Sequence, residues 1–170
     1  MKTDKEVLGS ANRILRENKL LTLATLGKSA PYANTAFYTF DKNFNLYIWS
    51  ENGSIHEKNV LKNRKVAVNI FDSSQKWGAK LQGLQATGTA TKVNNKELLK
   101  AGLLYLKRFP KALLMVKSPK NFHNKMFETT LYKIKLDWIK VFDEKNFGKE
   151  EHREIRLKQN GHLKTEVSGF

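Results

Sequence analysis

The stretch that decides the fold covers residues 31–72 and reads PYANTAFYTFDKNFNLYIWSENGSIHEKNVLKNRKVAVNIFD. Aromatic and β-branched residues fill 30–40 and 45–50 on either side of a polar turn, which predicts two antiparallel strands. The SIHE sequence that begins at Ser54 is a capping box, and it predicts a helix of at most two turns. A buried strand over 65–72 follows, so the expected order is strand, strand, helix, strand.

The rest of the chain extends this pattern in both directions. A capping box and apolar residues at helical spacing predict an amphipathic helix over 4–18. Asparagine caps predict a second long helix over 96–108, which ends before Pro110 because proline cannot continue the hydrogen-bond ladder. No element is assigned to 111–126. The other expected strands are 20–26, 80–93, 127–136 and 138–142 as one long or two short strands, and 154–157.

Two glycines, Gly83 and Gly88, interrupt the long strand expected over 80–93. Glycine inside a strand indicates a bulge or a close approach of another backbone. The same glycines give 83–89 a superficial likeness to a phosphate-binding P-loop. The segment lacks the P-loop lysine and does not open a helix, so it predicts no nucleotide site.

The fold class that follows is α+β, and mainly β. Six or seven short antiparallel strands with peripheral helices favour a closed or nearly closed barrel, because closure removes exposed sheet edges. No internal repeat and no Gly/Ser/Pro-rich linker divides the 170 residues, so we expect a single domain over 1–170 with a polar tail from about residue 158.

Composition excludes several kinds of site. The chain has no cysteine, which excludes disulfides, thiolate metal sites and Cys nucleophiles, and which fits a reducing cytoplasm. The four histidines are scattered without metal-ligand spacing, so no metal site is predicted. The sequence contains neither a nucleophile elbow nor a suggestive pair of carboxylates, so it does not indicate hydrolytic catalysis. The longest apolar run, 112–116, is far too short to span a bilayer, and we expect a cytoplasmic protein without a membrane segment.

The formal net charge of +15 is concentrated in one part of the chain. Residues 61–120 carry thirteen basic side chains against two acidic ones, and most of the basic residues are lysines. A cluster at Lys62, Arg64 and Lys65 is a candidate for phosphate contacts with RNA. No RNA-binding aromatic motif or helix-turn-helix pattern accompanies it, so a lysine-rich solvated surface is the favoured interpretation and nucleic acid is disfavoured as a partner.

The order of features over residues 12–92 resembles the pyridoxamine 5'-phosphate oxidase-like family of FMN-binding split barrels. In that family a Ser or Thr ends the third strand, a Ser-x-Lys follows a glycine, and a helix leads to an Asn-Pro-x-Val-Ala strand. Ser50, Ser54 and the strand from Val66 take these places here. A later Gly-x-Ala is matched by GTA from Gly88. The stretches YLKRFP (105–110) and FGK (147–149) are similar to a little-characterised bacterial branch of the family.

The resemblance implies a six- to seven-stranded antiparallel split β-barrel of Greek-key type, and a homodimer with one FMN per site at the subunit interface. Residues 34–37 would line the flavin ring, largely through backbone atoms, and Ser50, Ser54 and His56 would hold the phosphate. Gln82 or Gln85 would bond ring heteroatoms. The cofactor-binding residues expected are Asn34, Thr35, Ala36, Phe37, Trp49, Ser50, Ser54, His56, Asn59, Gln82, Gln85 and Lys149.

Two positions depart from the family pattern. Asn34 stands where the oxidases have an arginine, and His56 stands where they have the phosphate-binding lysine, so the expected site is short of positive charge. Arg64, Lys65 or the partner subunit's Lys149 are candidates to compensate. The function implied is that of an FMN-dependent oxidoreductase of unknown substrate, with no side chain assigned as catalytic. The alternative is a non-enzymatic protein on the same barrel that has lost the flavin and binds another anionic ligand, haem or RNA.

Overall fold

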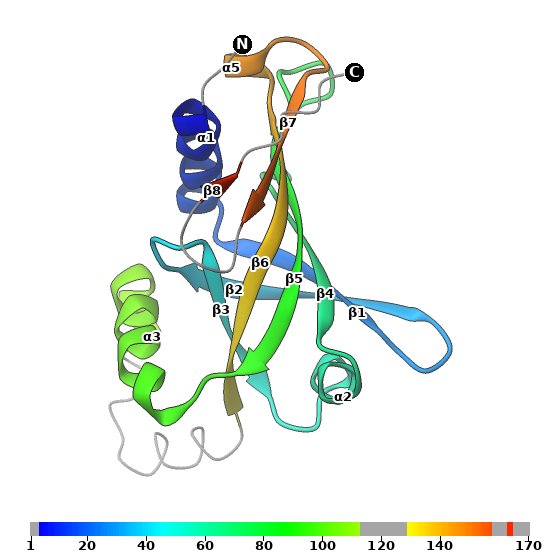
Figure 1. The fold of residues 1–170 in the computed structure, drawn as a ribbon, viewed down its shortest axis with the longest axis vertical. Helices are drawn as coiled ribbons and strands as arrows, with labels where there is room; N and C mark the ends of the chain where they lie inside the picture. The colour runs from blue at the N-terminus through cyan, green and yellow to red at the C-terminus, as the bar shows by residue number, and fades with distance from the viewer. Residues whose placement is uncertain (1–3, 113–128, 158–162, 165–170) are drawn as a thin grey trace.

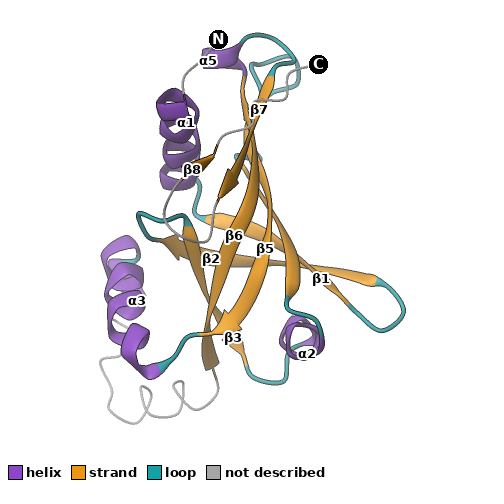
Figure 2. Ribbon diagram, viewed as in Figure 1, coloured by secondary structure: helices purple, strands orange, loops and turns teal. Residues whose placement is uncertain are grey.

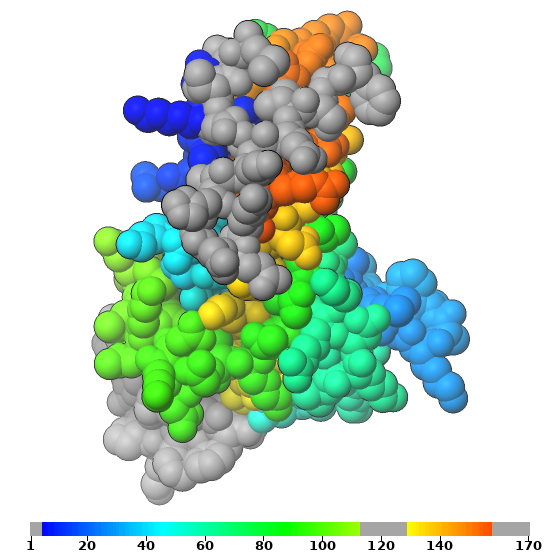
Figure 3. All heavy atoms as spheres, viewed as in Figure 1, coloured from blue at the N-terminus to red at the C-terminus, as the bar shows by residue number. Residues whose placement is uncertain are grey.

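The computed structural model describes residues 4–112, 129–157 and 163–164 (Figure 1). Figure 2 shows a strand-rich body with helices at its periphery, as the sequence predicts, and Figure 3 shows all heavy atoms in the same view. The elements, in chain order, are α1 (Asp4–Glu17), β1 (Leu20–Leu26), β2 (Pro31–Phe40), β3 (Asn45–Glu51), α2 (Ile55–Lys62), β4 (Lys65–Phe71), β5 (Gln82–Lys92), α3 (Asn95–Arg108), β6 (Thr129–Asp143), α5 (Glu144–Phe147), β7 (His152–Leu157) and β8 (Leu163–Lys164).

Six antiparallel strands close into a barrel. Their order is β3-β2-β1-β4-β5-β6, and β6 pairs back onto β3 to complete the circle. Strand β4 returns to lie beside β1 after the β1-β2-β3 meander, which is a Greek-key connection. Strand β7 adds to the far half of β6, and β8 pairs with β7. The predicted split barrel of Greek-key type is confirmed.

Strand β6 is one strand of 15 residues, which decides between the two alternatives left open by the sequence. Its pairing with β5 shifts register between Thr87 and Gly88, where Asp137 is the extra residue of a bulge. A Cβ atom on Gly88 would lie 2.4 Å from the Lys135 carbonyl oxygen, so only glycine fits there. The prediction that glycine marks a bulge or close approach in this strand is therefore confirmed.

The core fills the barrel and the space under α1. Alternate residues of β4, namely Val66, Val68 and Ile70, are buried, while their neighbours in the strand are exposed. The apolar face of α1 packs on the same core, as its helical spacing predicts. A second, smaller cluster lies under α3, where Tyr47, Ala101 and Leu131 are buried.

The barrel is open along one line, which we call the seam. Residues 31–37 of β2 pair with β1, but β2 pairs with β3 only over 38–40. The edge of residues 31–37 that faces away from β1 therefore pairs with no strand in the described part of the chain. The hydrogen bond from Asn59 Nδ2 to Thr25 Oγ1, at 3.1 Å, fixes α2 to β1 beside this seam.

The remaining differences from the predictions are local. The single helical turn α5 was not predicted, because a turn this short has no apolar period. The two-residue strand β8 falls within the expected polar tail. The start of the strand expected from 127, and the unassigned stretch from 113 onward, lie outside the described residues.

Candidate cofactor site

Three polar side chains meet where β3 passes into α2. Ser50 Oγ lies 2.8 Å from His56 Nε2 and 3.2 Å from Ser54 Oγ, and Ser54 Oγ lies 3.3 Å from the same His56 nitrogen. Ser54 is also the N-cap of α2, since its hydroxyl accepts from the Glu57 backbone N–H. We call Ser50, Ser54 and His56 the polar cluster. It brings together three residues that the sequence analysis assigned to the phosphate.

Glu57 holds the turn between Ser50 and Ser54. Its buried carboxylate accepts hydrogen bonds from Gly53 N at 2.5 Å and from the Tyr132 hydroxyl at 3.0 Å, and it pairs with Lys92 Nζ at 3.3 Å. Burial alone would raise the pKa of this carboxyl, but these three partners outweigh burial and hold the pKa below its ordinary value. Glu57 is therefore ionised and neutralised by Lys92 at pH 7.

His56 is held in its neutral form at pH 7. Burial lowers the pKa of its imidazole from the ordinary value of 6.5, and the nearby Glu57 carboxylate opposes this only in part. Ser50 is 2% exposed, so its close contact with His56 stabilises the β3–α2 turn and does not present a nucleophile to a substrate. The cluster offers hydroxyls and a neutral ring, and no fixed positive charge.

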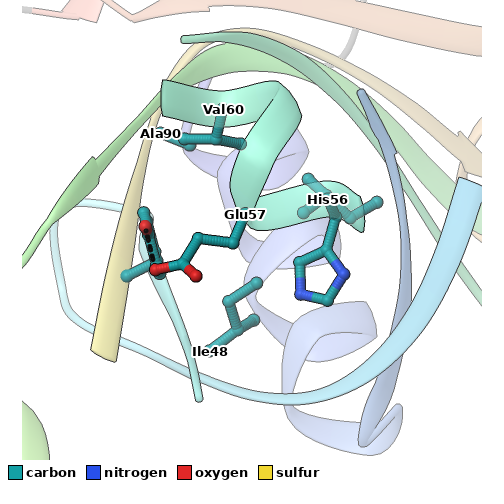
Figure 4. A pocket seen from close by; sticks show the side chains of 7 residues that line it. Ile48, His56, Glu57, Val60 and Ala90 are labelled. Carbon is teal, nitrogen blue, oxygen red and sulfur yellow. Dashed lines mark hydrogen bonds between the residues drawn. The ribbon is translucent and has the colours of Figure 1, made fainter. Parts of the chain in front are cut away.

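Figure 4 shows His56 and Glu57 pointing from α2 into the end of the barrel. The cavity that they line there has a volume of about 10 Å³. A space of this size holds one water molecule at most. A group larger than a water molecule can therefore reach the cluster only from outside this cavity.

The predicted ring-binding residues on β2 alternate between two faces. Asn34 lies opposite the buried Leu23 in the β1–β2 register, so both side chains face the barrel interior. Asn34 Oδ1 is buried and has no hydrogen-bond partner among the described residues. Ala36 shares this inner face and packs against the core, whereas Thr35 and Phe37 are exposed on the outer face.

An aromatic row crosses the seam on its outer side. Trp49 on β3 contacts Tyr105 on α3 with ring centroids 6.4 Å apart, Tyr105 contacts Phe109 at 4.8 Å, and Phe109 contacts Phe37 on β2 at 5.5 Å. The sequence analysis did not assign Tyr105 or Phe109 to the site. The only sequence feature that drew attention to them was the stretch 105–110, which is similar to one branch of the family. Their contacts could not be predicted, because they depend on how α3 packs.

Three predicted residues lie away from the cluster. Gln82 is bonded within the chain, since it accepts from Arg13 and donates to Asp143. Gln85 is exposed on the outer face of β5, and Lys149 is exposed between α5 and β7. Figure 1 shows α5 and α2 at opposite ends of the molecule. Within one chain the structure therefore does not bring Gln82, Gln85 or Lys149 to the polar cluster.

An open groove with a volume of about 440 Å³ lies on the outer surface. Residues of β1, β2, β4, β5 and β6 line it, among them Lys65 and Asp137, whose Nζ and Oδ2 atoms are 3.9 Å apart. Several large apolar side chains are exposed on the same outer face, among them Leu20, Phe37 and Phe71 at about half exposure. An exposed apolar sheet face of this kind is typical of an interface.

No group of three potential metal ligands occurs among the described residues. Within that part of the chain, no helix has the length and apolar character needed to cross a membrane.

A model of the pyridoxamine 5'-phosphate oxidase family matches residues 9–142, which is most of the chain. The chain belongs to this family. A relative in sequence, the UPF0306 protein PM1958 of Pasteurella multocida, is 26% identical over 130 residues, which cover 76% of this chain and 78% of that protein. The family membership suggested by the sequence is therefore confirmed.

Solved structures share the fold of this family member. A heme binding protein from Mycobacterium smegmatis superposes with a TM-score of 0.70 at 14% identity, covering 92% of this chain and 59% of that one. A FAD-binding protein from Mesorhizobium loti superposes with a TM-score of 0.57 at 15% identity, covering 78% and 89%. The fold therefore occurs in proteins with different ligands, and the ligand of this chain has to be argued from its own residues.

Proposed function

We propose that this family member binds FMN along the seam and is an FMN-dependent oxidoreductase. The observation that carries the proposal is the polar cluster at the N-terminus of α2, a helix that packs against β1 and β2, together with the edge of residues 31–37 that pairs with no described strand. Helix N-termini present free N–H groups and a positive dipole end to anions such as phosphate. An unpaired strand edge presents backbone donors and acceptors to the heteroatoms of a flavin ring.

The hydrogen-bonding groups of the polar cluster and of β2 match what FMN requires. The half-buried Ser54 hydroxyl would bond the phosphate, and the buried Ser50 would support it through their 3.2 Å contact. Asn34 Oδ1, which has no partner among the described residues, is an acceptor that a bound ligand would satisfy. A bound flavin supplies hydride or electron transfer, and the chain supplies orientation and electrostatics. The aromatic row from Trp49 to Phe37 would exclude water from the outer side of the seam.

The proposed assembly is a homodimer formed through the outer face of the sheet. Exposed Leu20, Phe37 and Phe71 favour burial against a second copy. In such a dimer the exposed Gln85 and the partner's Lys149 are available to a shared site, whereas Gln82 is already bonded to Arg13 and Asp143. Sedimentation velocity tests this. A dimer that Phe71→Asp converts to monomer is expected, and a wild-type monomer at tens of micromolar contradicts the assembly.

Titration of the purified protein with FMN tests the cofactor. Binding is expected to quench flavin fluorescence and to perturb the visible absorption bands. Ser54→Ala should weaken FMN by about tenfold, since it removes one hydrogen bond to a charged group, whereas the exposed Ser73→Ala should not change it. No binding at tens of micromolar by an intact dimer refutes the flavin proposal and leaves the fold unaffected.

Haem is the second candidate, and the observation that favours it is the half-buried His56, because burial lowers the pKa of its imidazole and keeps the ring neutral at pH 7. A neutral imidazole is the form that ligates iron. Titration with hemin distinguishes the candidates, because a ligated haem gives a sharp Soret band that should be lost in His56→Ala. A broad absorbance that the substitution does not alter is nonspecific association and counts against haem.

A further inference from the structure

Helix α3 has apolar residues on two opposite faces. Leu98, Ala101 and Leu104 belong to the smaller cluster beneath the helix, where Ala101 is buried and the two leucines are partly buried. On the other face, Leu99 is 75% exposed and Leu103 is 57% exposed. In a surface helix the outward face is normally polar, so two leucines one turn apart on that face are not explained by packing within the chain.

Three lysines share the outward face with these leucines. Each of the residues Lys96, Leu99, Lys100, Leu103 and Lys107 lies three or four positions from another member of the set, so together they form one stripe along the helix. All five are exposed, and Figure 3 shows α3, in light green, at the surface of the molecule. We call these five residues the α3 stripe.

The charge of the α3 stripe is positive and comes from lysine. Glu97 is the only acidic residue in the sequence between positions 95 and 112, and its carboxylate pairs with Lys133 Nζ of β6 at 2.6 Å. The arginine of α3, Arg108, donates inward to the Leu15 carbonyl and is not part of the stripe. The helix also lies in the part of the chain where basic residues most exceed acidic ones.

Exposed leucines beside lysines match the surface of an anionic lipid layer. Anionic headgroups attract lysines through a diffuse field, and the long lysine stems let the ammonium groups stay among the headgroups while leucines enter the layer beneath. A nucleic acid would match the charge but would leave the leucines in water. A folded protein would need a groove shaped to this convex helix, whereas a fluid lipid surface deforms around it.

We propose that α3 docks the protein on anionic lipid surfaces, with Leu99 and Leu103 inserted among the headgroups and the lysines of the α3 stripe paired with headgroup charges. The contact is peripheral, because an amphipathic helix of 14 residues lies along a membrane surface and is too short to cross it. This inference goes beyond the proposed function and does not depend on it, since the stripe lies on the face of α3 opposite the one that packs on the barrel.

Co-sedimentation with lipid vesicles tests the proposal. The wild type should bind vesicles of equal parts phosphatidylcholine and phosphatidylglycerol but not vesicles of phosphatidylcholine alone, and high salt should weaken binding because it screens the lysines. Lys100→Gln should lower the lipid partition coefficient about fivefold. Replacing both Leu99→Gln and Leu103→Gln should lower it by about tenfold or more. Glutamine is a good helix former, so these exposed substitutions preserve α3.

Matched variants separate the α3 stripe from the overall charge of the protein. Lys76→Gln removes one positive charge from an exposed position in the loop between β4 and β5. Leu61→Gln removes a leucine that is 61% exposed on α2. Neither change should alter the partition coefficient by more than about twofold, because charges beyond a Debye length of the contact are largely screened.

The absence of cysteine from the chain allows a direct measurement of insertion. Leu103→Cys provides a single attachment site for an environment-sensitive fluorophore. Its emission should shift to the blue on vesicles that contain phosphatidylglycerol, because the label leaves water. The same fluorophore attached through Leu61→Cys should not shift, since α2 is not part of the docking surface.

Four outcomes would refute the proposal. The first is a wild type that does not bind phosphatidylglycerol vesicles at low salt. The second is equal loss of binding in Lys76→Gln and Lys100→Gln, which indicates nonspecific attraction of a basic protein. The third is wild-type binding by the leucine variant with no shift of the label at position 103. The fourth is binding of RNA that Lys100→Gln weakens, without binding of vesicles, which assigns the stripe to nucleic acid. Each of these leaves the FMN titration unaffected, so failure here is distinguishable from failure of the proposed function.

Discussion

Arg108 is expected to fasten α3 to the rest of the molecule. Its Nη2 atom donates to the Leu15 carbonyl at 2.7 Å and to the Asn18 carbonyl, both at the C-terminal end of α1. Its guanidinium carbon lies 4.7 Å from the ring centroid of Tyr38 and 5.3 Å from that of Phe40. Burial lowers the pKa of Arg108, but an arginine remains charged at neutral pH.

The cost of Arg108→Ala follows from these contacts. Each hydrogen bond from a charged group contributes roughly 1.5 kcal/mol when partly exposed, and stacking on aromatic faces adds about 0.5–1 kcal/mol. The free energy of unfolding should therefore fall by about 3.5–4 kcal/mol. For a domain of this length, that lowers Tm by roughly 7–16 °C. Arg108→Lys should lose about half as much, because it keeps the charge but not the fork of donors.

Urea unfolding followed by tryptophan fluorescence measures this change as a shift in midpoint at constant m value. Lys107→Ala is the matched control, since it removes a basic side chain from the exposed position next to Arg108 on the same helix, and it should stay within about 0.5 kcal/mol of wild type. An Arg108→Ala variant as stable as Lys107→Ala would refute the assignment of Arg108 as the link between α3 and α1.

Three further predictions concern other parts of the barrel. Gly88→Ala places a Cβ atom 2.4 Å from the Lys135 carbonyl oxygen and should cost roughly 2 kcal/mol or more, whereas Gly102→Ala in α3 has open space and should stabilise by about 0.5–1 kcal/mol. Thermal unfolding compares the two, and equal effects would contradict the bulge geometry. Thr25→Val removes the hydrogen-bond partner of Asn59 Nδ2 and should lower the free energy of unfolding by about 1 kcal/mol. Thr22→Val, on the outer face of the same strand, should lower it little. Amide hydrogen exchange in α2 should become faster only in Thr25→Val. Burial would raise the pKa of the Asp143 carboxyl, but hydrogen bonds from Ser10, Arg13 and Asn146 hold it below its ordinary value. The stability it contributes is present above the unfolded pKa of about 4 and is lost as pH falls through the lower folded value. The Asp143→Asn variant should therefore be less stable than wild type at pH 7, yet it should lose less stability between about pH 4 and 2. A variant whose stability falls as steeply as that of wild type over this range would contradict the role given to the Asp143 carboxylate.

Most of the fold could be predicted because its signals are local. Caps, turns and alternation set the bounds of the strands and helices from residue 4 to Arg108 to within about two residues. The continuity of β6 could not be predicted, because the bulge at Asp137 exists only in register with Thr87 and Gly88 on β5. The polar cluster was accessible to sequence reasoning, since Ser50, Ser54 and His56 all lie within one strand-to-helix turn.

The rest of the site could not be predicted because it depends on long-range packing. The aromatic row joins Phe37, Trp49, Tyr105 and Phe109, which approach one another only when α3 lies across the seam. The separation of Gln82 from the cluster follows from the length and direction of β5, and its bonds to Arg13 and Asp143 come from α1 and β6. Sequence proximity gives no information about either.

The edge of residues 31–37 that pairs with no strand among the described residues also makes the protein prone to aggregation. Strand edges with free N–H and C=O groups accept any extended chain that reaches them, which is a route to aggregation. Pro31, which has no N–H, shortens this edge at its exposed end. If FMN lies along this edge as proposed, it would shield the remainder, so a preparation saturated with FMN should tolerate heating and concentration better than one without it.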